Sequence, residues 1–270
     1  MTRPIPTEWI TAPLLLIALV AAWQIYVTGA DVSAFILPPP AAVGAAFIEL
    51  LEQPSTWRHT AVTAWETFIG FLLALLIGVS TGLIVGHLRW LERTLDPFIV
   101  ASQVMPKVAL APLFVIWFGF GPTSKIVLGA MLAFFPIFAN TLLGVKSVDS
   151  AHRDVMLTFG APRRTRFRLL DLPSAAPAIL AGAEVGIVLS IVGCVVGEFL
   201  GGNSGLGYLL VARMNAYRTD SLFAILLLLT ALGLAFHAAV RAVRFVLVPW
   251  QGEGRKARGS APNSSRGGPR

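Results

Sequence analysis

The chain has 270 residues, of which 56% are apolar and only 13% are charged. A soluble globular domain usually carries about 25% charged residues, so this composition excludes a soluble enzyme, a disordered protein and a coiled coil. The apolar runs are also much longer than the roughly 10-residue strands of a membrane barrel. The sequence therefore predicts an all-α polytopic membrane protein.

The formal net charge is +7. We expect no nucleic-acid partner, because membrane proteins collect Lys and Arg in cytoplasmic loops and the sequence has no basic-aromatic motif of a known nucleic-acid reader. The single cysteine, Cys194, lies within an apolar run, so no internal disulfide can form. Four widely separated histidines give no metal-binding signature, and we expect no bound metal.

Six apolar segments are long enough to cross a bilayer as a helix, which takes about 20 residues. They lie at 9–30, 67–86, 97–120, 126–145, 177–200 and 222–240. The first connection, 31–58, is a long outer loop. Its prolines 38–40 end any helix from the first span, and a short amphipathic helix is expected at 41–51.

The distribution of basic residues predicts the orientation. If the N-terminus is cytoplasmic, sixteen Lys and Arg residues lie inside and four lie outside, with Lys107 within a span. Because basic loops stay in the cytoplasm, we expect both termini there. The stretch 32–34 resembles a signal-peptide cleavage site, but the preceding apolar run is longer than such signals have, so we expect it to stay uncleaved.

Three ionisable residues lie within the predicted spans: Lys107, Glu184 and Glu198. Such groups are costly in hydrocarbon and usually face a partner or a water-filled cavity. Two interpretations stay open, a buried pair between Lys107 and a carboxylate, or a wet translocation path lined by these groups. Glu198 lies near the outer end of its span, where it could also reach the membrane interface.

Glycines recur at four-residue intervals in the second and fifth spans. Such stripes let the backbone of another helix approach closely, so they predict tight packing, and a second interpretation is that they are sliding surfaces in a moving bundle. The positions are Gly78, Gly82 and Gly86, then Gly182 and Gly186, and then Gly193, Gly197 and Gly201.

The longest predicted cytoplasmic loop, 146–176, begins with a helical pattern. Asp149 or Ser150 can cap a helix over 151–159. Gly160 is then expected to end that helix, since a glycine just past the C-terminus adopts the left-handed conformation easily.

A second short helix follows in the same loop. Pro162 suits its first position, and Pro173 is expected to end it. The segment between them, 163–170, is strongly basic with interleaved Phe and Leu. Together the two helices predict a stiff elbow that lies flat on the cytoplasmic side and suits the docking of a partner.

The spacing in this elbow resembles the EAA loop of binding-protein-dependent ABC importer permeases. That loop typically has Glu-Ala-Ala, three residues, Gly, nine residues, Ile, one residue and Leu-Pro. Here Gly160 and Leu172-Pro173 keep the pattern and Leu170 occupies the Ile position, whereas Asp154 and Met156 depart from the usual Glu and second Ala. The substitutions at Asp154 and Met156 concern how this loop docks on its partner in detail.

Further stretches, in order over about residues 35–245, resemble the nitrate/sulfonate/taurine-type branch of the same family. They are Leu37-Pro38-Pro39-Pro40, Leu95-Asp96-Pro97, Pro106-Lys107-Val108-Ala109-Leu110-Ala111-Pro112-Leu113, Trp117-Phe118-Gly119-Phe120-Gly121, Ser124-Lys125, Phe134-Phe135-Pro136, Asn140-Thr141, Gly197-Glu198-Phe199-Leu200-Gly201 and Gly205-Leu206-Gly207-Tyr208.

This resemblance implies the type I ABC importer permease fold with six transmembrane helices in the bacterial inner membrane. It divides the chain into an N-terminal helix with its outer loop (1–58), a permease core (59–248) with the coupling loop 146–176, and a disordered basic tail (249–270).

The resemblance also implies a second permease copy as a homodimer, two cytoplasmic ATP-binding subunits and a periplasmic or lipid-anchored solute-binding protein. The expected cargo is a small solute: an anion of the nitrate, sulfonate or taurine kind, or a pyrimidine-type precursor.

The resemblance also implies which residues contact the ATPase. They are Asp154, Met156, Phe159, Gly160, Ala161, Arg163, Arg164, Phe167, Leu170 and Pro173. The translocation path is assigned, as a hypothesis from the charges within the spans, to Lys107, Glu184 and Glu198.

The chain has no phosphate-binding loop of the GxxxxGK[ST] type, no nucleophile elbow and no paired catalytic carboxylates. We therefore expect no enzymatic activity and no directly bound cofactor, with ATP and magnesium used by the partner subunits. The alternative is an ion-coupled secondary transporter, although no internal repeat of the kind found in such proteins is evident.

Overall fold

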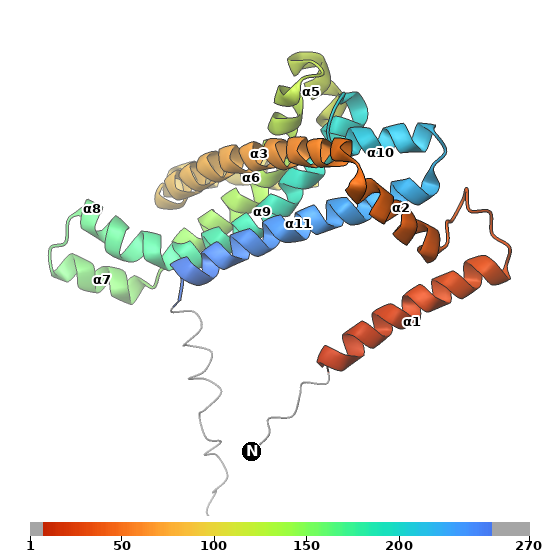
Figure 1. Cartoon of the computed structure of the whole chain (residues 1–270). Coiled ribbons are helices and arrows are strands. Elements are labelled where there is room, and N and C mark those ends of the chain that lie inside the picture. The colour runs from red at the N-terminus through yellow and green to blue at the C-terminus, as the bar shows by residue number, and fades with distance from the viewer. Residues whose placement is uncertain (1–7, 250–270) are drawn as a thin grey trace, which may run out of the picture. The chain divides into compact units, whose positions relative to one another are not determined.

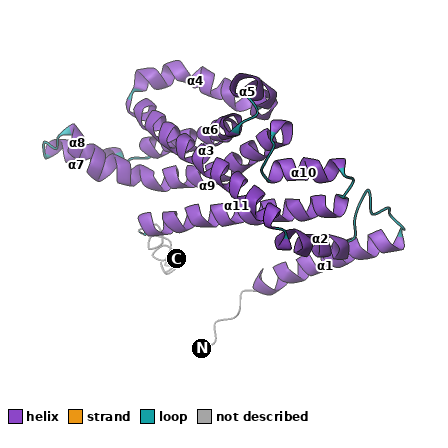
Figure 2. Cartoon of the chain, turned by 45° about the horizontal axis from the view of Figure 1, so that its top comes forward, coloured by secondary structure: helices purple, strands orange, loops and turns teal. Residues whose placement is uncertain are grey.

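The structure is a computed structural model that describes residues 8–249. The predicted disordered tail at 249–270 lies, apart from its first residue, outside the described residues. Within that described part the secondary structure consists of helices and loops (Figures 1 and 2). The helices are α1 (Glu8–Gly29), α2 (Pro40–Glu52), α3 (Pro54–His87), α4 (Arg89–Val104), α5 (Ala111–Phe118), α6 (Pro122–Lys146), α7 (Ser150–Thr158), α8 (Arg163–Arg166), α9 (Leu172–Gly201), α10 (Leu206–Asn215) and α11 (Thr219–Leu247).

Among residues 8–249, five helical stretches are long and apolar enough to cross a membrane, and a bent pair of helices supplies a sixth if it counts as one span. This agrees with the predicted number of crossings. The stretches are Thr11–Gly29, Pro54–His87, Pro122–Lys146, Arg163–Gly201 and Thr219–Leu247. The short helix expected at 41–51 is also confirmed, as α2.

The third predicted span is not the single helix over 97–120 that the apolar run suggests. α4 ends at Val104, Met105 has an extended backbone, and a 3-10 turn over Lys107–Leu110 leads into α5. The cause is Pro106, because a proline disfavours the helical conformation of the residue before it. The two helices meet at an angle of 83°, so the apolar run at 97–120 forms part of a broken span.

Contacts along the chain separate two compact units. Among the described residues, the first comprises 8–67 together with Leu110–Leu128 and Ile191–Leu234. The second comprises Phe68–Ala109, Gly129–Ser190 and 235–249.

In the first unit, α2, α10 and the start of α11 share a core. Its buried members are Ala46, Leu50, Leu206, Leu210, Ala224, Ile225 and Leu228. Polar contacts support the same helices from outside: the Arg218 guanidinium contacts Asp220 at 3.2 Å and Glu49 at 3.5 Å, and the Thr219 hydroxyl donates to the Phe35 carbonyl at 2.8 Å.

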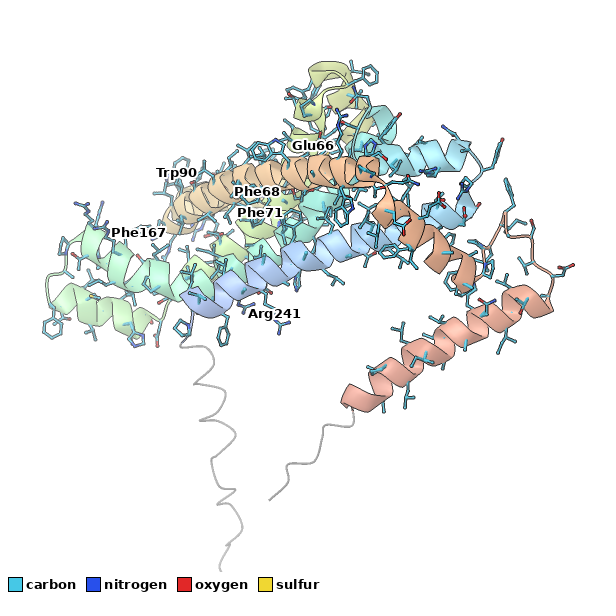
Figure 3. All side chains as sticks on the ribbon, viewed as in Figure 1. Glu66, Phe68, Phe71, Trp90, Phe167 and Arg241 are labelled. Carbon is cyan, nitrogen blue, oxygen red and sulfur yellow. The ribbon has the colours of Figure 1, made fainter. Side chains whose placement is uncertain are left out.

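In the second unit, α3, α6 and α9 pack around Phe71, which is labelled in Figure 3, together with Ala74, Ala133, Ile137, Ala183 and Ile187. Glycines make this packing possible. A Cβ atom on Gly82 would lie 2.6 Å from the Thr141 Cβ, and one on Gly182 would lie 2.7 Å from the Asn140 Cβ. The predicted tight packing of the glycine stripes is therefore confirmed here, since no larger residue fits.

Candidate functional site

The first arm of the elbow is fixed at both ends by backbone chemistry. The Asp149 carboxylate accepts from the Ala151 N–H at 2.9 Å, so the predicted cap at the start of α7 is confirmed. At the other end Gly160 has φ +65°, its N–H donates to the Leu157 carbonyl at 2.9 Å, and the Ala161 N–H donates to the Met156 carbonyl at 3.0 Å. This pair of bonds is a Schellman motif, which needs a left-handed residue and so favours glycine.

The second arm differs from the sequence expectation. Pro162 precedes α8 as its N-cap, and α8 does not end at Pro173 but continues through a π turn, Phe167–Asp171, directly into α9. In that wider turn the Leu172 N–H reaches back to the Phe167 carbonyl. Such a turn loosens the helix just before Pro173, which has no N–H to donate, so the ring is accommodated and the predicted stop is wrong.

The residues assigned to ATPase contact divide into two groups in the structure. Asp154, Phe159, Gly160, Arg163 and Arg164 are exposed, and the Phe159 side chain is 83% exposed. The other five are half-buried: Met156, Ala161, Phe167, Leu170 and Pro173. α7 and α8 lie side by side as two short arms (Figure 1).

A buried carboxylate that sequence reasoning missed ties the elbow to α3. The Asp171 carboxylate accepts from the Arg153 guanidinium at 3.0 Å and contacts the His87 Nε2 at 3.2 Å. His87 Nδ1 also lies 2.7 Å from the Leu83 carbonyl. Both partners of the ring are acceptors, so both contacts become hydrogen bonds only when the imidazole carries two protons. The only sequence signal was an acidic residue directly before Leu172-Pro173.

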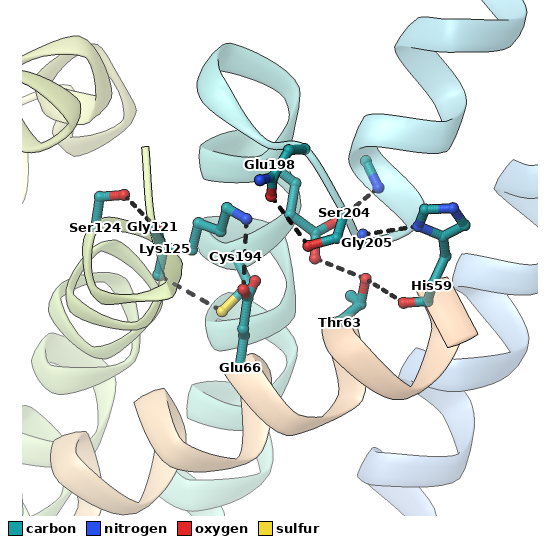
Figure 4. Close-up of polar contacts among 12 residues, drawn as sticks. His59, Thr63, Glu66, Gly121, Ser124, Lys125, Cys194, Glu198, Ser204 and Gly205 are labelled. Carbon is teal, nitrogen blue, oxygen red and sulfur yellow. Dashed lines mark hydrogen bonds and ion pairs between the residues drawn. The ribbon is translucent and has the colours of Figure 1, made fainter. Parts of the chain in front are cut away.

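A second buried cluster lies in the first unit (Figure 4). The Lys125 ammonium lies 3.4 Å from a Glu66 carboxylate oxygen, and each side chain is 2% exposed. The Cys194 thiol donates to the Lys125 carbonyl at 3.6 Å. The sequence pattern places Lys125 among the outer-loop charges, and although the second span (67–86) can be entered a turn or two earlier, near Thr60, Glu66 is not among the charges assigned to the spans. Both residues were therefore missed as intramembrane charges.

Glu198 belongs to the same cluster. Its carboxylate accepts from the Thr63 hydroxyl at 2.7 Å and from the Gly207 N–H at 2.6 Å. Glu198 is 1% exposed, so the alternative in which it reaches the membrane interface is wrong. A Cβ on Gly205, whose φ is +101°, would lie 2.1 Å from a Glu198 oxygen, which explains the glycine. The carboxylate thus fastens the α9–α10 loop to α3 (Figure 4).

The other two residues assigned to the path lie in the second unit. The Lys107 ammonium is 4.3 Å from the centroid of the Phe135 ring, a cation–π geometry, and no ion pair among residues 8–249 includes it. Glu184 pairs with Arg244 at 3.2 Å. The Lys107–carboxylate alternative is therefore wrong, whereas the path role of Lys107, Glu184 and Glu198 stays a prediction.

Comparison with known proteins identifies the family. The model of the binding-protein-dependent transport system inner membrane component matches residues 74–247. A riboflavin transport system permease protein of Chloroflexus aurantiacus is 36% identical over 246 residues, 90% of this chain and 92% of that protein. This chain belongs to that family. It is a multi-pass permease subunit of an ABC importer.

Other members of the family have different cargoes in their names. The formylaminopyrimidine transport permease protein of Halalkalibacterium halodurans is 35% identical, covering 80% of the permease described here and 86% of its own length. A putative aliphatic sulfonates transport permease of Bacillus subtilis is 31% identical, with 90% and 88% covered. The sulfonate-type branch expected from the motifs is thus confirmed among the relatives.

Solved structures agree with the fold. A chain of the MetNI methionine ABC transporter in an inward-facing conformation superposes with a TM-score of 0.63 at 19% identity, covering 73% of this permease and 99% of that chain. The predicted all-α permease fold is confirmed. Family membership makes the chain a transport subunit and not an enzyme, and it decides for the importer over the ion-coupled alternative.

Proposed function

We propose that a cytoplasmic ATPase subunit displaces the elbow, residues 150–171, and that the elbow transmits this displacement to the membrane helices. The observation that carries this proposal is the continuity of the helical run Arg163–Gly201, in which α8, the π turn and α9 follow without a break. A continuous helix transmits displacement along its axis because backbone hydrogen bonds join its successive turns. A push on α8 is therefore passed into α9.

Exposed apolar side chains on the elbow suit a protein partner. They are Val155, Leu157, Phe159 and Leu169, which are 51–83% exposed. Exposed apolar surface rimmed by charge marks interaction sites in soluble surroundings. The neighbouring Arg164 supplies a positive rim, so the docking groove of the ATPase is expected to be apolar with acidic edges.

The full assembly proposed is a homodimer of this permease, two ATP-binding subunits and a periplasmic or lipid-anchored solute-binding protein. ATP and magnesium bind to the ATP-binding subunits, since this chain has no phosphate-binding loop. Both termini and the elbow lie on the cytoplasmic side, a proposal supported by the sixteen basic residues there against four outside.

The proposed cargo is a small organic anion, such as a sulfonate, or a pyrimidine-type ring compound. A cavity of about 370 Å³ in the second unit supports this choice, because its lining includes Phe98, Phe134, Phe135 and Phe138. Lys107 stands over one of these rings, 4.3 Å from the centroid of Phe135. Aromatic faces with one nearby cation suit a solute that has a flat or apolar body and a negative group.

The coupling role is tested with Gly160→Pro. A proline cannot adopt φ +65°, so the Schellman turn is lost and the arms of the elbow splay. We expect normal membrane insertion, loss of ATPase co-purification and loss of ATP-driven uptake in vesicles that contain all subunits. Gly119→Pro is the matched control, because Gly119 has φ +77° and, like Gly160, has open space around it. It is expected to keep the ATPase bound. Normal uptake by Gly160→Pro would exclude the coupling role.

A further inference from the structure

The second unit has a cavity of about 830 Å³ between the end of α3 and the elbow. It is open on one side, and its wall has a charged part from the elbow and an apolar part from α3. Two of its lining residues, Arg163 and Phe167, are also among the residues assigned to ATPase contact. None of the four exposed apolar residues of the elbow, Val155, Leu157, Phe159 and Leu169, belongs to its lining.

The charged part of the wall is strongly positive. It includes Arg153, Arg163 and Arg166, with Asp171 as its carboxylate. Asp171 is already engaged by Arg153 at 3.0 Å and by His87 at 3.2 Å. Within the described residues 8–249, no ion pair neutralises Arg163 or Arg166. Two guanidinium groups therefore line the cavity without a partner.

The apolar part of the wall belongs to a membrane-spanning helix. Leu83, Ile84 and Leu88 line the cavity at the point where the apolar run Pro54–His87 ends. Trp90 follows at once and is 66% exposed (Figure 3), as is common where a span meets the membrane surface. A ligand in this place would meet cations at one end and hydrocarbon-facing side chains at the other.

We propose that this cavity binds an anionic phospholipid, with the phosphate held by Arg163 and Arg166 and an acyl chain lying along Leu83 and Ile84. Guanidinium groups bind phosphate oxygens through paired, charge-assisted hydrogen bonds. Basic pockets beside transmembrane helices at the cytoplasmic surface suit such headgroups. A free phosphate satisfies the arginines but leaves the apolar wall uncovered, so a lipid fits better. The proposal rests on the cavity, and although Arg163 is also assigned to ATPase contact, lipid binding is measured on the permease without the ATPase.

The test uses the full-length chain in nanodiscs of phosphatidylcholine with a minor fraction of phosphatidylglycerol. Native mass spectrometry then counts the phosphatidylglycerol molecules that stay bound. Each arginine beside an anionic lipid contributes about a fivefold gain in affinity, so Arg163→Gln with Arg166→Gln is expected to lower retention about 25-fold. Arg164→Gln with Arg168→Gln is the matched control, because it removes the same charge from the same segment outside the cavity lining. Its retention is expected to stay within about twofold, since neither side chain faces the cavity.

A second variant tests the cavity without changing charge. Ile84→Trp adds bulk to the apolar wall and is also expected to reduce lipid retention. If the lipid were held only by non-specific attraction to the basic surface, this variant would retain as much lipid as the parent. Three results on lipid retention would overturn the proposal: an equal loss of phosphatidylglycerol in the matched control, unchanged retention in the Arg163 and Arg166 variant, or unchanged retention in Ile84→Trp. Displacement of the lipid by inorganic phosphate would also overturn it, because free phosphate would then be the ligand.

Discussion

Replacing Lys125 by methionine removes the cation from a pair that the first unit buries almost completely. Both side chains of the Lys125–Glu66 pair are 2% exposed, and Glu66 is left as a carboxylate without its ammonium partner. The neighbouring Thr63 hydroxyl and Gly207 N–H already donate to Glu198, so they cannot take over. Removing one partner of a buried ion pair costs about 3–5 kcal/mol, because the remaining charge is buried without compensation.

For a chain of this size 1 kcal/mol corresponds to roughly 2–4 °C, so Lys125→Met is expected to lower Tm by about 6–20 °C. The assay is thermal unfolding of the purified chain in detergent, followed by tryptophan fluorescence. Lys146→Met is the matched control, because the Lys146–Glu92 pair has side chains that are 47% and 22% exposed. Exposed pairs contribute about 0–1 kcal/mol, so the control is expected to stay within about 4 °C of the parent.

A double variant separates the pair from simple loss of packing. Glu66→Gln together with Lys125→Met removes both charges, so it is expected to recover more than half of the Tm lost by Lys125→Met alone. If Lys125→Met unfolds within 2 °C of the parent, or if the double variant is no more stable than the single one, the reasoning about this pair is refuted.

Two further predictions follow from packing and from the aromatic cavity. Gly82→Ala is expected to lower Tm, because the new Cβ would lie 2.6 Å from the Thr141 Cβ. Gly233→Ala is the control: a Cβ there has nothing within 4 Å, so the variant is expected to gain up to about 1 kcal/mol of helix stability. Equal Tm shifts of the two variants in the same assay would contradict the close-packing argument. Lys107→Ala is expected to raise the KM for an anionic solute about tenfold and to leave a neutral solute unaffected, since a cation near the solute is worth about one power of ten. Vesicle uptake with Lys107→Arg as control measures this, and an unchanged KM would remove Lys107 from the path.

Much of the elbow could be predicted from the sequence because its determinants are local. Asp149 caps a helix that begins one residue later, and Gly160 ends the same helix with bonds that reach back three and five residues. Such features depend on the conformation of a few neighbouring residues, which residue type largely fixes. α2 could be predicted in the same way, because the prolines at 38–40 mark its start.

The rule that a proline interrupts a helix holds at Pro106 but not at Pro173. At Pro106 the chain breaks into two helices, whereas at Pro173 a π turn lets the helix continue. Both prolines lack an N–H, so the residue type is the same and the surroundings decide. Beside Pro173, the buried Asp171 is held by Arg153 and His87, which fastens the wider turn to α3.

Composition, the lengths of the apolar runs and the basic loops were enough to predict a helical membrane protein with six crossings, since the bilayer sets the length of a span by itself. The buried charges were decided by tertiary structure alone. Glu66 meets Lys125 across 59 positions of sequence, and Thr63 meets Glu198 across 135. Whether a charge near a span end faces water or a partner depends on which helix packs beside it, and no local pattern in the sequence carries that information.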